Sequence, residues 1–175
     1  ARSQQSLTDF LHRQALALRL SDTDRAALRF LIESLNDDGY LEDSLRSLAE
    51  TLAGDDEEQL EELEHRFQVA LHLLHSLEPT GVGARDLAEC LSLQLKALDS
   101  EDEELLAVRD VALAICKQPL ELLARRDVKR LVLAVGDTDV RVKQAMALIA
   151  RLEPKPGRRF VDVERQVVIP DVLVT

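Results

Sequence analysis

Apolar residues recur at helical spacing along most of the chain. Leu7, Leu11 and Leu18 lie four and seven positions apart, which places them on one face and predicts a helix over residues 7–20. Ser21, with an acidic residue three positions later, is a typical helix start. The same periodicity predicts a second helix after Ser21, a third after Asp43 or Ser44, and further helices over about 57–78, 85–98, 105–118, 120–124, 128–135 and 139–152.

The segment from Leu77 to Leu87 interrupts this pattern. Pro79 cannot continue a helix, and the glycines after it allow a tight change of direction. We call this segment the elbow, and its candidate residues are Glu78, Pro79, Gly81, Gly83, Arg85 and Asp86. A sequence like the one that leads into the elbow occurs a second time. Residues 70–79 align with residues 145–154 at an offset of 75, and both segments end in Leu-Glu-Pro. The match predicts two helical modules that close in similar ways, with coincidence as the alternative.

These patterns predict an all-α fold of two small helical bundles joined by the Pro/Gly elbow. We expect an N-terminal subdomain of about four helices over residues 1–80 and a C-terminal helical subdomain over residues 81–156. Beyond residue 156 the β-branched residues favour extended chain, so residues 157–175 are expected to be a short extended tail or the start of the next domain. A first residue other than Met suggests a fragment of a longer polypeptide.

The net charge differs along the chain, and with it the kind of partner that each segment can bind. Residues 1–80 carry 7 basic and 17 acidic side chains, and residues 81–118 carry 4 and 8, so phosphates should repel both segments. Residues 119–175 carry 11 basic and 8 acidic side chains and alone suit a phosphate backbone. We therefore expect a protein partner for the first two-thirds. Because no apolar run is long enough to cross a bilayer, we expect a cytoplasmic protein without a membrane partner.

The cysteines are expected in the core, and the candidate metal ligands are expected on the surface. Cys90 and Cys116 lie 26 residues apart with no C-x-x-C pair, and helical spacing places both among core positions. Two acid-x-x-His pairs could belong to a carboxylate-bridged metal site in a helical bundle. Helical-wheel positions direct them outward, and His72 and His75 are also expected to be exposed. The outward-facing pairs are Glu62 with His65 and Asp9 with His12.

No catalytic motif is present. The chain lacks the G-x-S-x-G nucleophile motif and the phosphate-binding G-x-x-x-x-G-K-[ST], and the glycines of the elbow follow a helix instead of a strand. We therefore expect no enzymatic activity, no cofactor and no small-molecule substrate.

Residues 128–152 offer an alternative function. A short helix, a turn containing Gly136 and a second helix follow the outline of a DNA-binding helix-turn-helix, although packed helical hairpins share this outline. In that interpretation Arg141, Lys143 and Gln144 would read bases. The phosphate contacts would come from Arg125, Arg126, Lys129 and Arg130.

Several motifs in order resemble the central region of the sigma-54 RNA polymerase factors. They are residues 21–25 (SDTDR), 37–41 (DDGYL), 77–87 (LEPTGVGARDL) with 89–91 (ECL), 153–157 (EPKPG) and 168–172 (VIPDV). Each motif is weak alone, but together they span nearly the whole chain. Asn36 stands where the family usually has an acidic residue.

The resemblance implies a core-binding domain, with two helical subdomains that hold the factor on core RNA polymerase. Promoter DNA and the ATP-dependent activator would be reached only through regions of the full-length protein that are missing here. The elbow residues would act through structure or, alternatively, touch polymerase directly. The other candidate polymerase contacts are Asp24, Arg25, Asp37, Asp38 and Tyr40.

Overall fold

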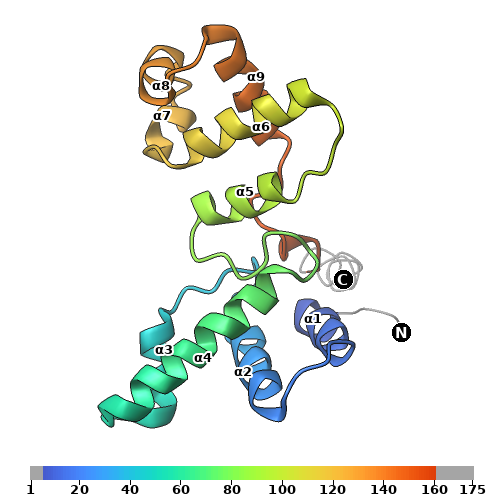
Figure 1. The fold of residues 1–175 in the computed structure, drawn as a ribbon, viewed down its shortest axis with the longest axis vertical. Helices are drawn as coiled ribbons and strands as arrows, with labels where there is room; N and C mark the ends of the chain where they lie inside the picture. The colour runs from blue at the N-terminus through green and yellow to red at the C-terminus, as the bar shows by residue number, and fades with distance from the viewer. Residues whose placement is uncertain (1–5, 161–175) are drawn as a thin grey trace, which may run out of the picture. The chain divides into compact units, whose positions relative to one another are not determined.

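A computed structural model describes residues 6–160, and these residues form helices joined by turns, without a strand (Figure 1). The all-α prediction is confirmed. None of the described helices is both long and apolar enough to cross a membrane. The helices are α1 (Leu7–Leu16), α2 (Asp22–Glu33), α3 (Leu45–Ala53), α4 (Glu57–His75), α5 (Leu87–Lys96), α6 (Glu103–Cys116), α7 (Leu120–Ala124), α8 (Val128–Val135) and α9 (Asp139–Ala150).

Side-chain caps start the helices where the sequence predicted them. The Ser21 hydroxyl accepts a hydrogen bond from the backbone N–H of Asp24, and Ser44 caps α3 in the same way. Asp127 caps α8 by accepting from the backbone N–H of Arg130. The predicted ends were too late for α1, α4 and α9, which stop at residues 16, 75 and 150. Helix ends depend on long-range contacts as well as on local periodicity.

The chain divides into two compact units. Among the described residues, unit 1 comprises 6–86 and 155–160, and unit 2 comprises 87–154. The boundaries predicted for the second subdomain were residues 81 and 156. The difference arises because residues 81–84 and Gly157 form backbone hydrogen bonds with the turn at residues 38–41 of unit 1.

The segment expected to be extended chain lies mostly outside the described residues. Its first part, Arg158 to Phe160, forms a helical turn instead, with the Phe160 N–H donating to the Gly157 carbonyl. Packing explains this turn: the Phe160 ring lies 5.7 Å from the Phe10 ring. The expected strands over residues 161–175 lie outside the described residues.

In unit 1, α4 packs against α2 and α3 (Figure 1). Leu28, Ile32 and Leu74 are fully buried there, and the rings of Phe30 and Phe67 stack 5.4 Å apart. Helix α1 adds Leu7, Leu11 and Ala15 to the same core. Leu7 and Leu11 are among the positions that helical spacing placed on one face.

In unit 2, α6 packs against α9, α5 and α8. The core includes Leu95, Ala112 and Leu131, which have no exposed surface. Cys90 and Cys116 are both buried, as helical spacing predicted. A core of small and aliphatic side chains explains how the unit folds without Phe, Tyr or Trp.

Candidate functional site

The elbow is fixed to unit 1 by backbone hydrogen bonds. The N–H of Gly83 donates to the carbonyl of Gly39 (2.8 Å), and the N–H of Leu41 donates to the carbonyl of Ala84 (2.9 Å). The His75 Nε2 lies 3.1 Å from the Gly83 carbonyl, to which it donates. His75 is therefore half-buried, and the prediction that it is exposed was wrong, because the elbow folds back over the end of α4.

The two elbow glycines occupy backbone conformations that other residues rarely adopt. Gly81 has φ 100° and Gly83 has φ 84°. A Cβ atom at Gly83 would also lie 2.7 Å from Leu74 Cδ2. Val82, which lies between the two glycines, and Ala84, which follows them, are fully buried. The elbow is thus a packed turn whose sequence is dictated by close approach to α4.

The remaining elbow residues differ in exposure. Pro79 is buried, whereas Glu78, Arg85 and Asp86 are exposed. The main chain of Glu78 is engaged on both sides by one side chain: its N–H donates to Gln14 Oε1 (2.8 Å), and Gln14 Nε2 donates to its carbonyl (2.6 Å). We call this arrangement a glutamine clasp. It satisfies two backbone groups that have left the helix.

Unit 2 contains the same clasp at the second Leu-Glu-Pro. The N–H of Glu153 donates to Gln94 Oε1 (2.9 Å), and Gln94 Nε2 donates to the Glu153 carbonyl (2.6 Å). Helices α4 and α9 also end at matched positions, residues 75 and 150. The prediction that two modules close in similar ways is confirmed.

The two glutamines were not among the predicted residues, although the sequence contains a signal for them. Gln14 is the eighth residue of α1 and Gln94 the eighth residue of α5, each within the pattern Leu-x-x-x-Leu-x-x-Gln. The two copies of this pattern align at an offset of 80 residues.

The turn at residues 36–41 is held from inside and from the far end of the described chain. Asn36 Oδ1 accepts from the N–H groups of Asp38 and Tyr40, both at 3.0 Å. The Asp38 carbonyl accepts from the Gly157 N–H (2.9 Å), and its carboxylate lies 3.3 Å from Arg158 Nε. The last residue of the motif at 153–157 therefore meets the motif at 37–41 within unit 1.

The other predicted polymerase contacts divide by what they touch. Arg25 donates to the carbonyls of Ala15 (3.0 Å) and Leu18 (2.9 Å), where α1 ends. Asp24 lies 3.6 Å from Arg66. Asp37 is exposed, and Tyr40 is half-buried. Most of these side chains have a structural task within unit 1.

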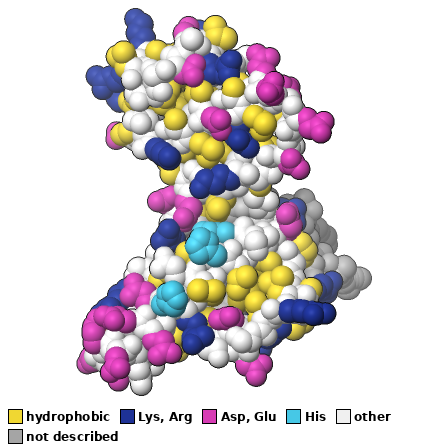
Figure 2. Space-filling view, in the orientation of Figure 1, with side chains coloured by type: hydrophobic (Ala, Val, Ile, Leu, Met, Phe, Trp, Pro, Cys, Tyr) yellow, Lys and Arg dark blue, Asp and Glu magenta, His cyan; other side chains and the backbone are white. Residues whose placement is uncertain are grey.

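Acidic side chains gather over α3 and the start of α4 (Figure 2). Arg46 lies among them, 3.0 Å from Glu57, 3.7 Å from Glu64 and 3.8 Å from Glu50. The hydrogen bond to Glu57, followed by its charge, raises the pKa of Arg46. This end of unit 1 presents a strongly negative surface, which suits a protein or cationic partner better than nucleic acid.

The acid-x-x-His pairs do not converge. Glu62 is exposed beside Arg66 (3.6 Å), and His65 is exposed, as predicted. His12 is only 25% exposed and pairs with Glu33 of α2, so its predicted outward direction was wrong: α2 covers it. Within residues 6–160, no three His, Cys, Asp or Glu side chains come together as a metal site requires.

The basic residues of the helix-turn-helix interpretation lie in unit 2. Helix α8, a turn with Gly136 in the left-handed conformation (φ 71°) and α9 reproduce the expected outline. Lys143 lies 3.4 Å from Asp139, and Arg130 lies 3.7 Å from Asp127. Arg141 is half-buried. The side chains of Arg125, Arg126, Lys129 and Gln144 are exposed.

The family model described as "Sigma-54 factor, core binding domain" matches residues 1–175. Among curated proteins, the chain is similar to the RNA polymerase sigma-54 factors of Pseudomonas aeruginosa (36% identical over 172 residues, 98% of this chain and 33% of the relative) and Salmonella typhimurium (38% over 170 residues, 97% and 34%). The corresponding factor of Escherichia coli is 34% identical over 170 residues, with 97% and 34% covered. The chain thus spans about a third of these relatives.

Proposed function

The chain belongs to the sigma-54 factor core binding domain family, and we propose that it binds core RNA polymerase by protein–protein contact. The observation that carries the proposal is the family match over all 175 residues. The acidic end of unit 1 supports it, because a surface of this sign disfavours phosphate contacts. In this proposal the chain acts by binding and not by catalysis. Promoter DNA and the ATP-dependent activator are engaged through other parts of a longer sigma-54 factor.

We propose that the elbow contributes through structure. Support comes from the burial of Val82 and Ala84 and from the hydrogen bonds of the elbow to Gly39 and Leu41. Among the proposed polymerase contacts, Asp37 is the exposed carboxylate on the turn, and it is the side chain that we would change first. Asp24, Arg25 and Asp38 have intramolecular partners.

The test is direct titration of a fluorescently labelled 175-residue chain with purified core RNA polymerase. We expect saturable binding that survives moderate salt, because the proposed contact is between proteins. A parallel titration with duplex DNA tests the helix-turn-helix alternative, which predicts steeply salt-dependent binding that is lost when Arg141 and Lys143 are changed to Ala. DNA binding without polymerase binding would overturn the proposal. The comparisons support the core-binding interpretation and not the DNA-reading alternative.

A further inference from the structure

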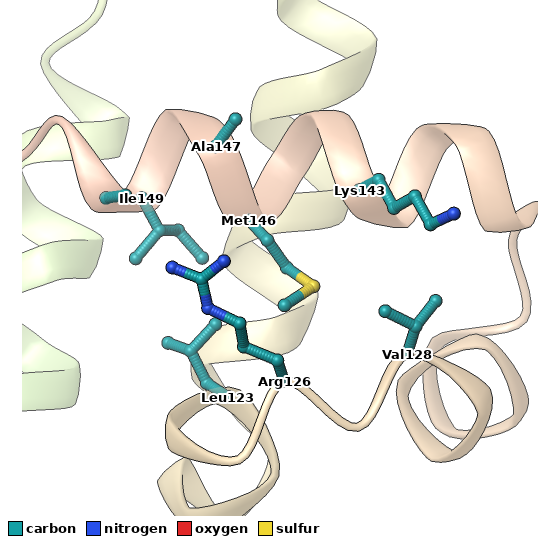
Figure 3. Close-up of a pocket in the computed structure, with 8 residues that line it drawn as sticks. Leu123, Arg126, Val128, Lys143, Met146, Ala147 and Ile149 are labelled. Carbon is teal, nitrogen blue, oxygen red and sulfur yellow. The ribbon is translucent and has the colours of Figure 1, made fainter.

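The surface of unit 2 is hollowed between α9 and the segment that joins α7 to α8. The hollow has a volume of about 470 Å³, and its apolar lining includes Leu123, Val128, Met146 and Ile149. Figure 3 shows Met146 and Ile149 projecting from α9 toward Leu123 and Arg126. A methionine in such a position suits an adaptable contact, because its side chain is flexible and polarizable.

A second hollow of about 640 Å³ continues the first along α8 and α9. The two share Val128 and Lys143, and the second adds Val132 and Leu133. Leu133 is 83% exposed, the highest value among the exposed large hydrophobic side chains of the described residues. We call the two hollows together the α8–α9 groove. A contiguous apolar surface of this kind marks an interaction site more often than a scattered exposed leucine does.

Positive charge borders the groove. Arg126, Lys129 and Lys143 line it, against the single carboxylate of Asp139, so its lining carries a net charge of +2 (three positive minus one negative). Arg126 also has φ 55°, a left-handed conformation rare for residues other than glycine. That conformation is held by the tight turn in which the Asp127 N–H donates to the Leu122 carbonyl.

We propose that the α8–α9 groove binds an acidic amphipathic helix of core RNA polymerase, an inference that rests on the proposed function and specifies part of the contact. The groove follows α9 from Asp139 to Ile149, which is about 15 Å at the helical rise of about 1.5 Å per residue. This length fits about three turns of a partner helix, with apolar anchors at i, i+4 and i+7. Carboxylates beside those anchors would meet Arg126, Lys129 and Lys143.

An acidic helix fits these features better than the other occupants do. The phosphates of a nucleic acid would find cations at the rim but only aliphatic side chains on the floor. If a second copy of this chain bound in a symmetric contact, the two positively charged grooves would face and repel each other. An extended segment would need a strand edge or an aromatic-lined groove. Residues 6–160 contain no strand, and no aromatic side chain lines this groove.

The first test measures binding of the full 175-residue chain to core RNA polymerase. Leu133→Asp should weaken binding about tenfold or more, because it removes an apolar anchor and adds a charge repelled by the acidic partner. Leu16→Asp is the matched control: Leu16 is 72% exposed, does not line the groove and is not among the proposed polymerase contacts, so binding should be unchanged. Both changes are at exposed positions, and equal unfolding midpoints verify that the variants fold.

A second variant removes charge without straining the backbone. Arg126→Gly deletes the guanidinium at a position whose φ favours glycine, so stability should be kept while binding weakens severalfold. The probe is a synthetic amphipathic helix with leucine anchors and glutamates beside them, compared with its lysine counterpart. Met146 is the single methionine of the sequence, so its ¹³C-methyl resonance reports groove occupancy. The glutamate peptide should shift that resonance and the lysine peptide should not.

The outcomes separate the two proposals. If the wild-type chain does not bind core polymerase, the proposed function fails and this inference with it. If the wild-type chain binds and Leu133→Asp binds equally well, only the groove assignment is overturned. Equal responses to the two peptides, a Met146 shift caused by duplex DNA, or a dimer in sedimentation that Leu133→Asp dissociates would each overturn the acidic-helix assignment.

Discussion

The side-chain amide of Gln14 pairs with both polar groups of the Glu78 main chain, although the two residues are 64 positions apart. Glu78 lies between the end of α4 and Pro79, where the backbone has left the helix and has no helical partner for its N–H or carbonyl. The amide of glutamine carries a carbonyl oxygen that accepts and an NH2 group that donates, which match those two groups. Gln94 does the same for Glu153 in unit 2.

We expect Gln14→Ala to lower the free energy of unfolding by about 1–2 kcal/mol, since two hydrogen bonds of about 1 kcal/mol each are lost at a partly exposed site. Gln14→Glu keeps the acceptor for the Glu78 N–H but cannot donate to its carbonyl, so its loss should be intermediate. Urea unfolding measures both. Wild-type stability in Gln14→Ala would contradict a role for the clasp.

Gly83→Ala should destabilise unit 1 more than Gly54→Ala does. Both glycines have positive φ, but a Cβ atom at Gly83 would lie 2.7 Å from Leu74 Cδ2, whereas one at Gly54 meets nothing within 4 Å. Backbone strain alone costs about 1–2 kcal/mol, and overpacking adds about 1–3 kcal/mol. We therefore expect losses of about 1 kcal/mol at Gly54 and about 3 kcal/mol at Gly83, measured by urea unfolding. Equal losses would mean that α4 yields to the added methyl group.

Arg25→Ala should lower stability by about 1–2 kcal/mol, because the guanidinium donates to two carbonyls at the end of α1. Arg25→Lys should recover only part of this loss, since lysine lacks the planar fork that reaches both carbonyls. Binding to core polymerase, measured where the variants remain folded, separates the structural role from a direct contact. Reduced affinity with unchanged stability would favour direct contact.

Because of Cys116, the free energy of unfolding should fall as the pH rises in the alkaline range. Burial, offset in part by a hydrogen bond from Ser92, raises the pKa of the Cys116 thiol above its ordinary value. Above about pH 8.5 the unfolded chain ionises this thiol while the folded chain keeps it protonated, so the unfolded state binds fewer protons and stability falls as pH rises. The contribution is fully present below that pH.

Unfolding of wild type and Cys116→Ala across about pH 7–10 measures this effect. The variant should be less stable throughout, because a buried side chain is shortened, but its stability should fall less steeply above about pH 8.5. Parallel slopes would show that Cys116 is not the group responsible.

Local patterns predicted the helices well. Helical spacing identified the core faces, and Ser21, Ser44 and Asp127 marked helix starts that the structure confirms. The repeated Leu-Glu-Pro correctly indicated two modules with similar endings. These features are decided within a few residues along the chain, so one sequence is enough to recognise them.

Side-chain exposure at the edges of helices was less predictable. His12 and His75 both occupy flank positions of their helices, and each was expected to be exposed. Helix α2 covers His12 through Glu33, and the elbow covers His75 through the Gly83 carbonyl. A helical wheel gives the direction of a side chain but not which distant segment will lie over it.

The sequence by itself determined helices in two apolar modules, a tight turn after Pro79 and an uneven distribution of charge. Only the tertiary structure decided that Gly157 returns to the turn at Asp38, that Gln14 and Gln94 hold the two Leu-Glu-Pro ends, and that Leu133 borders a groove. The reason is physical: periodicity and capping are local properties, whereas these contacts depend on which surfaces meet when distant segments pack.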